Sequence, residues 1–237
     1  MQAQAPASID AHAGAREPNP ILSRAIAAAH RSRLDLALFD FDSTITTRDT
    51  FAEFIRFAAP RSRHLWGGPL LAPLAMGYRM GWVSGHLLRA SAVRVGLGGV
   101  PLAVARAHGE RFAEEVLATI ERPEIMARIA WHRERGDDIM VVSGALDLYL
   151  APWCRSHGLR WLCSELEVVE DRLTGRYRGE QCVADAKRQR VLGAVDLARY
   201  AAIHAYGDSP DDHAMLRMAQ HAHYRGQPWV DPKQGTT

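Results

Sequence analysis

The sequence predicts an α/β protein whose core is a doubly wound parallel sheet, with an α-helical domain inserted into it. Three apolar runs predict the sheet, at residues 34–39, 138–145 and 201–206. Each run ends in acids, a serine or a glycine, and open α/β sheets bind their ligands at the carboxyl ends of their strands. The stretch between the first two runs has no alternating pattern and shows helical spacing, which predicts the insertion.

The first run ends in two acids, Asp40 and Asp42, followed by Ser43 and Thr44. Two carboxylates this close rarely share one role, because their environments push their pKa values apart. One can stay ionised as a nucleophile and metal ligand while the other transfers a proton. The alternative is structural, since aspartate and serine also cap helices and fill turns.

The second run ends in Ser143 and Gly144, which predicts a hydroxyl and free backbone N–H groups at the same sheet edge. A hydroxyl beside a glycine that opens a helix is a good site for phosphate oxygens. Lys187 lies at the start of a helix predicted over residues 188–197. It can neutralise a phosphoryl group and its aspartyl acceptor, although a lysine near a helix start is usually only solvated.

The third run is followed by a glycine turn and a cluster of acids, Asp208, Asp211 and Asp212. Mg²⁺ takes hard oxygen ligands and usually binds one or two protein carboxylates, with water and phosphate completing its octahedron. The sequence therefore predicts a Mg²⁺ site here.

Taken in order, these segments resemble the four motifs of the haloacid-dehalogenase-like phosphatase superfamily: Asp40-x-Asp42-Ser43-Thr44, Ser143-Gly144, Lys187 and Gly207-Asp208-Ser209-x-x-Asp212. The resemblance spans about residues 34–228 and is closest to the phosphoserine-phosphatase-like branch, which residues 165–176 also resemble. Pro210-Asp211 departs from that branch's Ala-Asn-like pair, which argues against phosphoserine itself as the substrate.

The resemblance implies a Rossmann-like core, a helical cap between the first and second motifs, and a Mg²⁺-dependent phosphatase mechanism. In that mechanism Asp40 is the nucleophile that forms an aspartyl-phosphate, and Asp42 is the general acid and base. Mg²⁺ would be held by the Asp40 carboxylate, the Asp42 backbone carbonyl and Asp208. Asp212 would orient the metal-bound waters or Lys187, and the phosphate contacts would be Ser143, Gly144, Lys187 and Thr44.

Two further residues are candidates for binding the substrate. Asp49 stands where phosphoserine phosphatases carry a glutamate that binds the substrate ammonium group, and Arg89 of the cap suits a carboxylate or a second phosphate. The favoured alternative for Asp49 is that it supplements a helix cap at Thr50 with negative charge.

The predicted domains are a core of residues 34–48 and 129–230, a cap of residues 49–128, and flexible tails at 1–33 (with a lead-in helix) and 231–237. In the cap, Thr50 and Glu53 predict a capping box that opens a helix with one apolar face. Helices are also expected over residues 101–120 and 123–135, with Gly136 as the stop.

Residues 65–78 of the cap are apolar throughout, with arginines on both sides. They fall short of the roughly 20 residues that span a bilayer. The favoured interpretation is a buried helix pair. The alternative is an interfacial anchor or an acyl-chain groove, similar to the cap segments of bacterial lipid-phosphate phosphatases.

Composition fits an enzyme that acts on a small phosphate ester. The net charge is only +2, so no nucleic-acid partner is expected. The odd number of cysteines, without CxxC spacing, predicts reduced, partly buried thiols of a cytoplasmic protein. The first thirty residues lack the pattern of a secretory signal, which predicts a flexible tail. The alternatives are a lipid-phosphate phosphatase of the phosphatidylglycerophosphate or lysophosphatidate type, a phosphotransferase and a phosphate-sensing binding module. A dehalogenase would not need the acid at Asp42.

Overall fold

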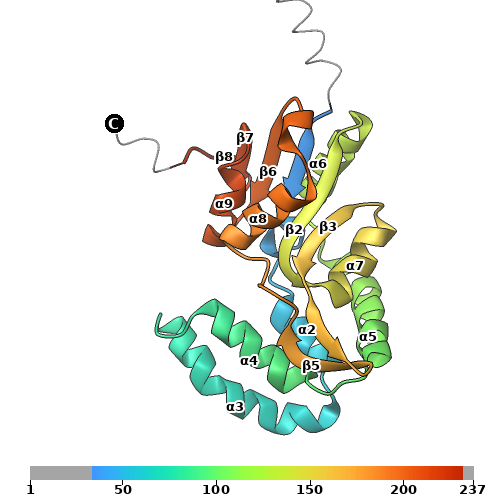
Figure 1. The fold of residues 1–237 in the computed structure, drawn as a ribbon, viewed down its shortest axis with the longest axis vertical. Helices are drawn as coiled ribbons and strands as arrows, with labels where there is room; N and C mark the ends of the chain where they lie inside the picture. Colours follow the sequence, from blue (N-terminus) through green and yellow to red (C-terminus); the bar gives the residue numbers. More distant parts are fainter. Residues whose placement is uncertain (1–33, 232–237) are drawn as a thin grey trace, which may run out of the picture. The chain divides into compact units, whose positions relative to one another are not determined.

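The computed structural model describes residues 34–231, and their centre is a six-stranded sheet (Figure 1). The strand order is β3(Arg160–Ser164), β2(Asp138–Leu146), β1(Leu36–Phe39), β6(Ile203–Gly207), β7(His221–Tyr224) and β8(Gln227–Pro228). The first five strands are parallel and β8 is antiparallel. The predicted tail and lead-in helix over residues 1–33, and the predicted tail after residue 231, lie outside the described residues.

The three apolar runs of the sequence form the centre of this sheet. β1 pairs with both β2 and β6, and Phe39 lies opposite Val141 on one side and Tyr206 on the other. Because all three strands run in the same direction, their carboxyl ends meet at one edge. The predicted α/β fold is confirmed.

Helices cover both faces of the sheet, because alternate residues of a strand point to opposite sides. Leu36 and Leu38 belong to the apolar cluster that includes Val191 of α8(Asp185–Ala194) and Met215 of α9(His213–Leu216). Ala37 and Phe39 belong to the other cluster, with residues of α6(Pro123–Glu134) and α7(Asp147–Ser156). The core is therefore doubly wound, as predicted.

Four helices lie between β1 and α6: α2(Phe51–Ala58), α3(Arg61–Arg79), α4(Gly85–Leu97) and α5(Leu102–Glu115). The hairpin of β4(Leu166–Val169) and β5(Arg172–Tyr177) lies beside α4. The segment that joins α4 to α5 is hydrogen-bonded to this hairpin, because the Gly99 amide donates to the Leu173 carbonyl. The predicted boundary at residues 128 and 129 lies inside α6, which packs on the core sheet through Ile129. The division into core and cap at those residues stays a prediction.

Several local predictions need correction. The helix expected to open at Gly144 begins at Asp147, because β2 continues through Ala145 and Leu146, which are fully buried. The helix that carries Lys187 spans Asp185–Ala194 rather than residues 188–197. Residues 101–120 form α5 and a separate short turn rather than one helix. As predicted, α6 ends just before Gly136, whose φ of +79° is typical of a glycine that follows a helix.

The capping box predicted at Thr50 and Glu53 is wrong. The Thr50 side chain makes no cap hydrogen bond to the helix, because its hydroxyl donates to Asp42 instead, and Glu53 pairs with Arg48. The predicted apolar face of α2 is nevertheless buried, as its four apolar residues show: Phe51, Phe54, Ile55 and Ala58.

The buried helix pair favoured for residues 65–78 is also wrong. These residues lie in one helix, α3, whose only buried residues are Gly67 and Gly77. A Cβ on Gly77 would come within 2.7 Å of the Val83 side chain, so the small residues of α3 are the ones that face the protein. Most of the large apolar side chains are exposed, and Leu70 is 57% exposed.

Two further observations concern the cysteines and the helices. The cysteines at 154, 163 and 182 are all buried and unbridged, in agreement with the predicted thiols. Among residues 34–231, no helix is both long enough and apolar enough to cross a membrane.

Candidate active site

A buried lysine joins two of the predicted site residues. The Lys187 ammonium lies 2.6 Å from Asp40 Oδ1 and 2.5 Å from Asp212 Oδ1, and all three side chains are almost fully buried. Asp40 directly follows β1, and Lys187 lies in the first turn of α8. Burial raises the pKa of Asp40 to about 8, with the Asp212 charge adding to the effect and Lys187 opposing it. Two carboxylates thus share one ammonium.

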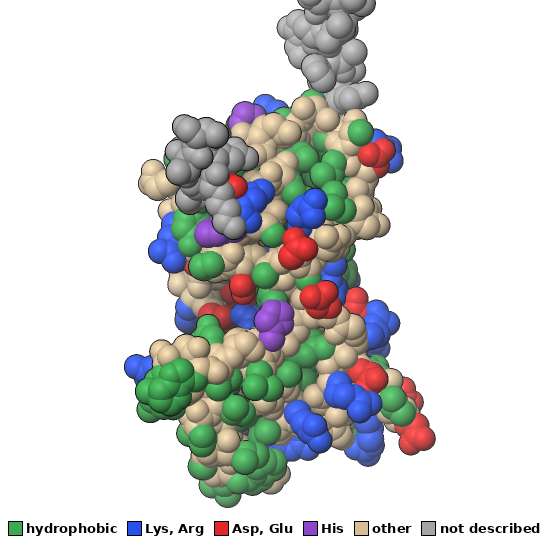
Figure 2. Space-filling model, turned by 60° about the vertical axis from the view of Figure 1, so that its left-hand side comes forward, with side chains coloured by type: hydrophobic (Ala, Val, Ile, Leu, Met, Phe, Trp, Pro, Cys, Tyr) green, Lys and Arg blue, Asp and Glu red, His purple; other side chains and the backbone are tan. Residues whose placement is uncertain are grey.

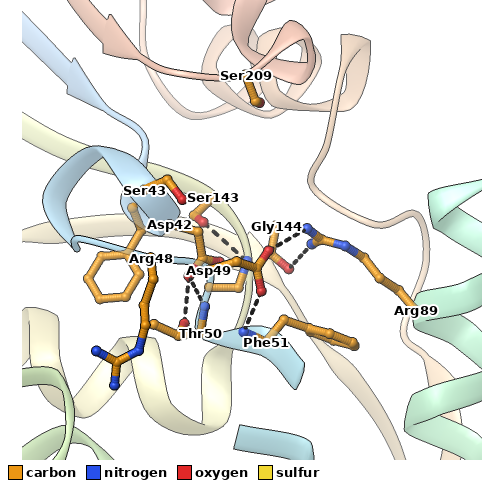
Figure 3. A network of polar contacts seen from close by, with 12 residues as sticks. Asp42, Ser43, Arg48, Asp49, Thr50, Phe51, Arg89, Ser143, Gly144 and Ser209 are labelled. Atoms are coloured by element: carbon orange, nitrogen blue, oxygen red, sulfur yellow. Dashed lines mark hydrogen bonds and ion pairs between the residues drawn. The ribbon is translucent and has the colours of Figure 1, made fainter. Parts of the chain in front are cut away.

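Asp42 is held apart from this group by Thr50. Its Oδ1 accepts hydrogen bonds from the Thr50 amide at 2.8 Å and the Thr50 hydroxyl at 2.6 Å (Figure 3). Burial raises the pKa of Asp42 to about 6, and the Asp49 charge adds to this effect, while both hydrogen bonds from Thr50 oppose it. The two acids of the first motif therefore occupy different environments, as their predicted division of roles requires.

Asp208 completes a cluster of carboxylates at the end of β6. One oxygen from each of Asp40, Asp208 and Asp212 lies within 4.8 Å of the others. Oxygen donors this close fit a hard divalent cation such as Mg²⁺. The charge balance also fits, because the three acids face Lys187 as their one buried cation within the described residues.

Asp212 is already engaged by the protein. Its Oδ1 accepts from Lys187, and its Oδ2 accepts from the Asp208 amide, the Ser209 amide and the Ser209 hydroxyl at 2.9–3.0 Å. Gly207 makes this close approach feasible, because a Cβ there would lie 2.5 Å from Asp212 Cβ. These contacts fit a role for Asp212 in orienting Lys187 and the Asp208 loop.

The predicted phosphate-binding residues lie beside Asp40 or on β2. Thr44 Oγ1 is 3.5 Å from Asp40 Oδ2, and the buried Ser143 hydroxyl accepts a hydrogen bond from the Ala145 amide at 3.1 Å. Ser43 and Ala184, which flank the segments of Asp42 and Lys187, have φ values of 59° and 49°. Left-handed backbone at residues other than glycine is strained and gathers at functional sites.

Arg89 and Asp49 form a pair above Gly144 (Figure 3). The Arg89 guanidinium lies 3.6 Å from Asp49 Oδ2 and donates to the Gly144 carbonyl at 3.4 Å. Asp49 Oδ1 also accepts from the Phe51 amide, so the residue does cap α2. Arg89 comes from α4, and the structure thus brings both candidate substrate-binding residues to the edge of β2.

An apolar cavity of about 600 Å³ begins at this pair. It lies between α2, α3 and α4, and glycines, alanines and leucines line much of it, including Gly67, Leu71, Ala75, Leu88 and Ala92. Ligand pockets commonly have volumes of roughly 300–1,000 Å³ and mostly apolar walls. The cavity is therefore large enough to hold an apolar part of a ligand.

Sequence reasoning missed three residues near these acids. Thr50 was expected to cap a helix, Tyr149 places its hydroxyl 3.2 Å from the Thr50 hydroxyl, and Arg225 donates to the Asp208 carbonyl at 2.8 Å. None of them lies in one of the four motifs. The only sequence signal was the pattern of Thr50 and Glu53, which predicted a helix cap for Thr50 rather than a hydrogen bond to Asp42.

Comparisons with known proteins agree with this geometry. Residues 37–217 match the family described as haloacid dehalogenase-like hydrolase. Protein CicA of Caulobacter vibrioides is 32% identical over 194 residues, which cover 80% of this chain and 85% of CicA.

Solved structures share the fold. A Bordetella pertussis Tohama I protein of unknown function is 24% identical with a TM-score of 0.67, over 81% of this chain and 89% of its own. A phosphoserine phosphatase captured as a phospho-aspartyl intermediate analogue is 22% identical with a TM-score of 0.53, over 81% and 86%. The resemblance to the phosphoserine-phosphatase-like branch is confirmed at the level of the fold.

Proposed function

Because this chain belongs to the haloacid dehalogenase-like hydrolase family, we propose that it hydrolyses phosphate monoesters through an aspartyl-phosphate, with Mg²⁺ as cofactor. The observation that carries the proposal is the contact of Lys187 with Asp40. A carboxylate held by a buried ammonium at a sheet edge is oriented for attack, and the same ammonium can stabilise a transferred phosphoryl group.

Asp40 is the nucleophile in this proposal. One of its oxygens forms a bond to phosphorus while the bond from phosphorus to the leaving alcohol breaks, which gives an aspartyl-phosphate and an alcohol. Water then attacks the same phosphorus and releases phosphate and the free Asp40 carboxylate. Ser143 and Lys187 donate hydrogen bonds to the phosphoryl oxygens in both steps.

Asp42 transfers the protons. Protonated, it gives its proton to the leaving alkoxide in the first step, and ionised, it takes a proton from the attacking water in the second. A pKa of about 6 suits both uses, because neither form is strongly disfavoured near neutral pH. Thr50 holds the carboxylate through two hydrogen bonds, so Asp42 does not pair with Lys187.

The cation would be held by the Asp40 carboxylate, the Asp42 backbone carbonyl and Asp208. When bound, Mg²⁺ polarises phosphoryl oxygens and offsets their charge. Asp212 would act through its hydrogen bonds to the Asp208 loop and Lys187.

The proposal is tested by phosphate release from p-nitrophenyl phosphate with Mg²⁺ and after chelation. Mg²⁺-dependent release of phosphate is expected. If the protein binds the phosphate ester but releases no phosphate from it, the protein is a binding module. Adding an alcohol acceptor separates a phosphotransferase, which would form a new ester.

A second candidate narrows the substrate to an amphiphilic phosphate ester. The apolar cavity beginning at Asp49 and Arg89 favours it over the small polar metabolite expected from the sequence. Comparing kcat/KM for phosphoserine, glycerol phosphate and lysophosphatidate distinguishes the two. A higher value for the polar esters would favour the metabolite.

The pH profile offers a prediction about Asp42. With p-nitrophenyl phosphate, whose leaving group hardly needs a proton, dephosphorylation should limit turnover. That step needs Asp42 ionised, so kcat should rise with pH through about 6. Thr50→Val removes the hydroxyl bond that favours the ionised form, which raises the pKa and moves this limb to higher pH. Thr47→Val, at an exposed neighbouring threonine, is the control. A limb that stays in place or moves to lower pH in Thr50→Val would contradict the role of Asp42.

Metal binding should be visible without activity. Added Mg²⁺ should raise the melting temperature of the wild type, because a cation that binds only the folded state stabilises it. Asp208→Asn should need a higher Mg²⁺ concentration for the same rise in melting temperature. The loss of Mg²⁺ affinity should exceed the roughly 10–100-fold that follows when a residue hydrogen-bonded to a metal ligand is removed. Asp211→Asn, at the exposed acid next to the cluster, should leave it unchanged. An equal response in the two variants would place the cation elsewhere.

A further inference from the structure

One face of α3 carries large apolar side chains that are exposed to solvent. Leu65, Pro69, Pro73 and Met76 follow at helical spacing, and all four are exposed. Leu65 is 84% exposed, and Trp66 and Leu70 extend the same face. The apolar surface continues past the end of α3 to Met80 and Trp82, and Trp82 is 77% exposed.

The opposite side of α3 accounts for its attachment to the protein. Gly67, Leu71 and Ala75 line the cavity toward α2 and α4. Arg63 binds the carboxyl end of α4, where its guanidinium donates to the carbonyls of Val95, Gly96 and Gly98. The helix is thus fixed by its small residues and by Arg63, and the exposed face adds nothing to this packing.

The stretch of chain that contains α3 and α4 carries positive charge and no acidic residue. From residue 54 to residue 109 the sequence contains no aspartate or glutamate. The same stretch contains seven arginines: Arg56, Arg61, Arg63, Arg79, Arg89, Arg94 and Arg106. Arg61 and Arg79 are exposed at the two ends of α3. Figure 2 shows hydrophobic side chains gathered at the lower left of the molecule, whereas the acidic side chains of its lower part lie on the right.

We propose that this exposed face of α3, with Trp82, docks the protein onto the surface of an anionic lipid bilayer. An interfacial helix buries its apolar side chains at the boundary between headgroups and acyl chains, and flanking arginines pair with anionic headgroups. Tryptophan suits that boundary because its ring is amphipathic. The cavity that reaches Arg89 lies between the same helix, α2 and α4.

Charge argues against the other occupants of this face. A second copy packed symmetrically would bring its arginines against these arginines, with no acid from residues 54–109 to pair with them. The chain's own residues 1–33 hold only Asp10 and Glu17 as acids, against four arginines: Arg16, Arg24, Arg31 and Arg33. An anionic membrane is the partner whose charge complements the face.

Vesicle binding tests the proposal with the full chain and without substrate, so its outcome is independent of the proposed activity. Wild-type protein should sediment with vesicles of phosphatidylcholine and phosphatidylglycerol at physiological ionic strength, and tryptophan emission should shift to the blue. Higher salt should weaken the binding, because surface electrostatics is screened. Vesicles of phosphatidylcholine alone should bind far less protein.

Variants separate the apolar and charged contributions. Arg61→Ala with Arg79→Ala should weaken binding by roughly 10- to 30-fold, from about 1 kcal/mol for each arginine near an anionic surface. Leu65→Gln with Leu70→Gln should weaken it at least as much without lowering the melting temperature. The matched controls lie on the core, where Leu192→Gln and Arg199→Ala replace an exposed leucine and an exposed arginine and should leave binding unchanged.

Three results would overturn the proposal. The first is a wild type that stays in the supernatant with anionic vesicles. The second is a dimer in solution that Leu70→Gln dissociates, which would make the face an interface between copies. The third is a drop in the melting temperature of the Leu65→Gln and Leu70→Gln variant, which would mean that the chain's own terminal residues cover the face.

Discussion

Asp40→Asn is expected to lower turnover by roughly three orders of magnitude or more, since the covalent step requires a carboxylate oxygen as nucleophile. The fold should persist. Asparagine keeps the shape of the side chain, and Lys187 retains Asp212 as its partner.

The measurement is kcat with p-nitrophenyl phosphate, together with the melting temperature and phosphate binding of the variant. Asp211→Asn is the matched control, because Asp211 is an exposed acid near the same site. Retention of more than a tenth of the wild-type activity by Asp40→Asn, with the control active, would rule out Asp40 as nucleophile.

Asp42→Asn is expected to have an effect that depends on the leaving group. Loss of a general acid should slow an alkyl phosphate by roughly 10²–10⁴-fold. An aryl phosphate such as p-nitrophenyl phosphate has a stable leaving group that hardly needs protonation, so its first step should slow much less. The amide oxygen can still accept from Thr50, which keeps the side chain in place.

Rapid-mixing kinetics separate the two steps. With p-nitrophenyl phosphate, Asp42→Asn should show a burst of nitrophenol followed by slow turnover, because water attack then lacks its base. Equal losses for aryl and alkyl phosphates in the first step would remove Asp42 from proton transfer.

The sheet and its functional edge were predictable from the sequence because the signal is local. An apolar run followed at once by Asp40, by Ser143 or by Asp208 places each side chain at the end of a strand, and parallel strands bring these ends together. The contacts of Asp40 and Asp212 with Lys187 agree with the motif order, although the helix that carries Lys187 begins earlier than expected.

The remaining features depend on contacts between distant residues. The Thr50 hydroxyl could cap α2 or bind Asp42, and the choice depends on where the turn after β1 places that carboxylate. The pair of Asp49 and Arg89 joins residues forty positions apart through the packing of α4. The orientation of α3 was missed because Gly67 and Gly77, the least hydrophobic residues of an apolar run, are the ones that face the protein.

Trapping the phosphoenzyme tests the central claim most directly. The protein is mixed with substrate and Mg²⁺, quenched in acid during turnover, reduced with borohydride before the acyl phosphate is lost, and then digested with trypsin and sequenced by mass spectrometry. Cleavage after Arg33 and Arg48 gives one peptide that contains both Asp40 and Asp42. Homoserine is expected in place of Asp40 in this peptide, because borohydride reduces an aspartyl-phosphate to that residue, and none is expected in Asp40→Asn. An unmodified peptide while product forms, or homoserine in place of Asp42, would contradict the role of Asp40 as nucleophile.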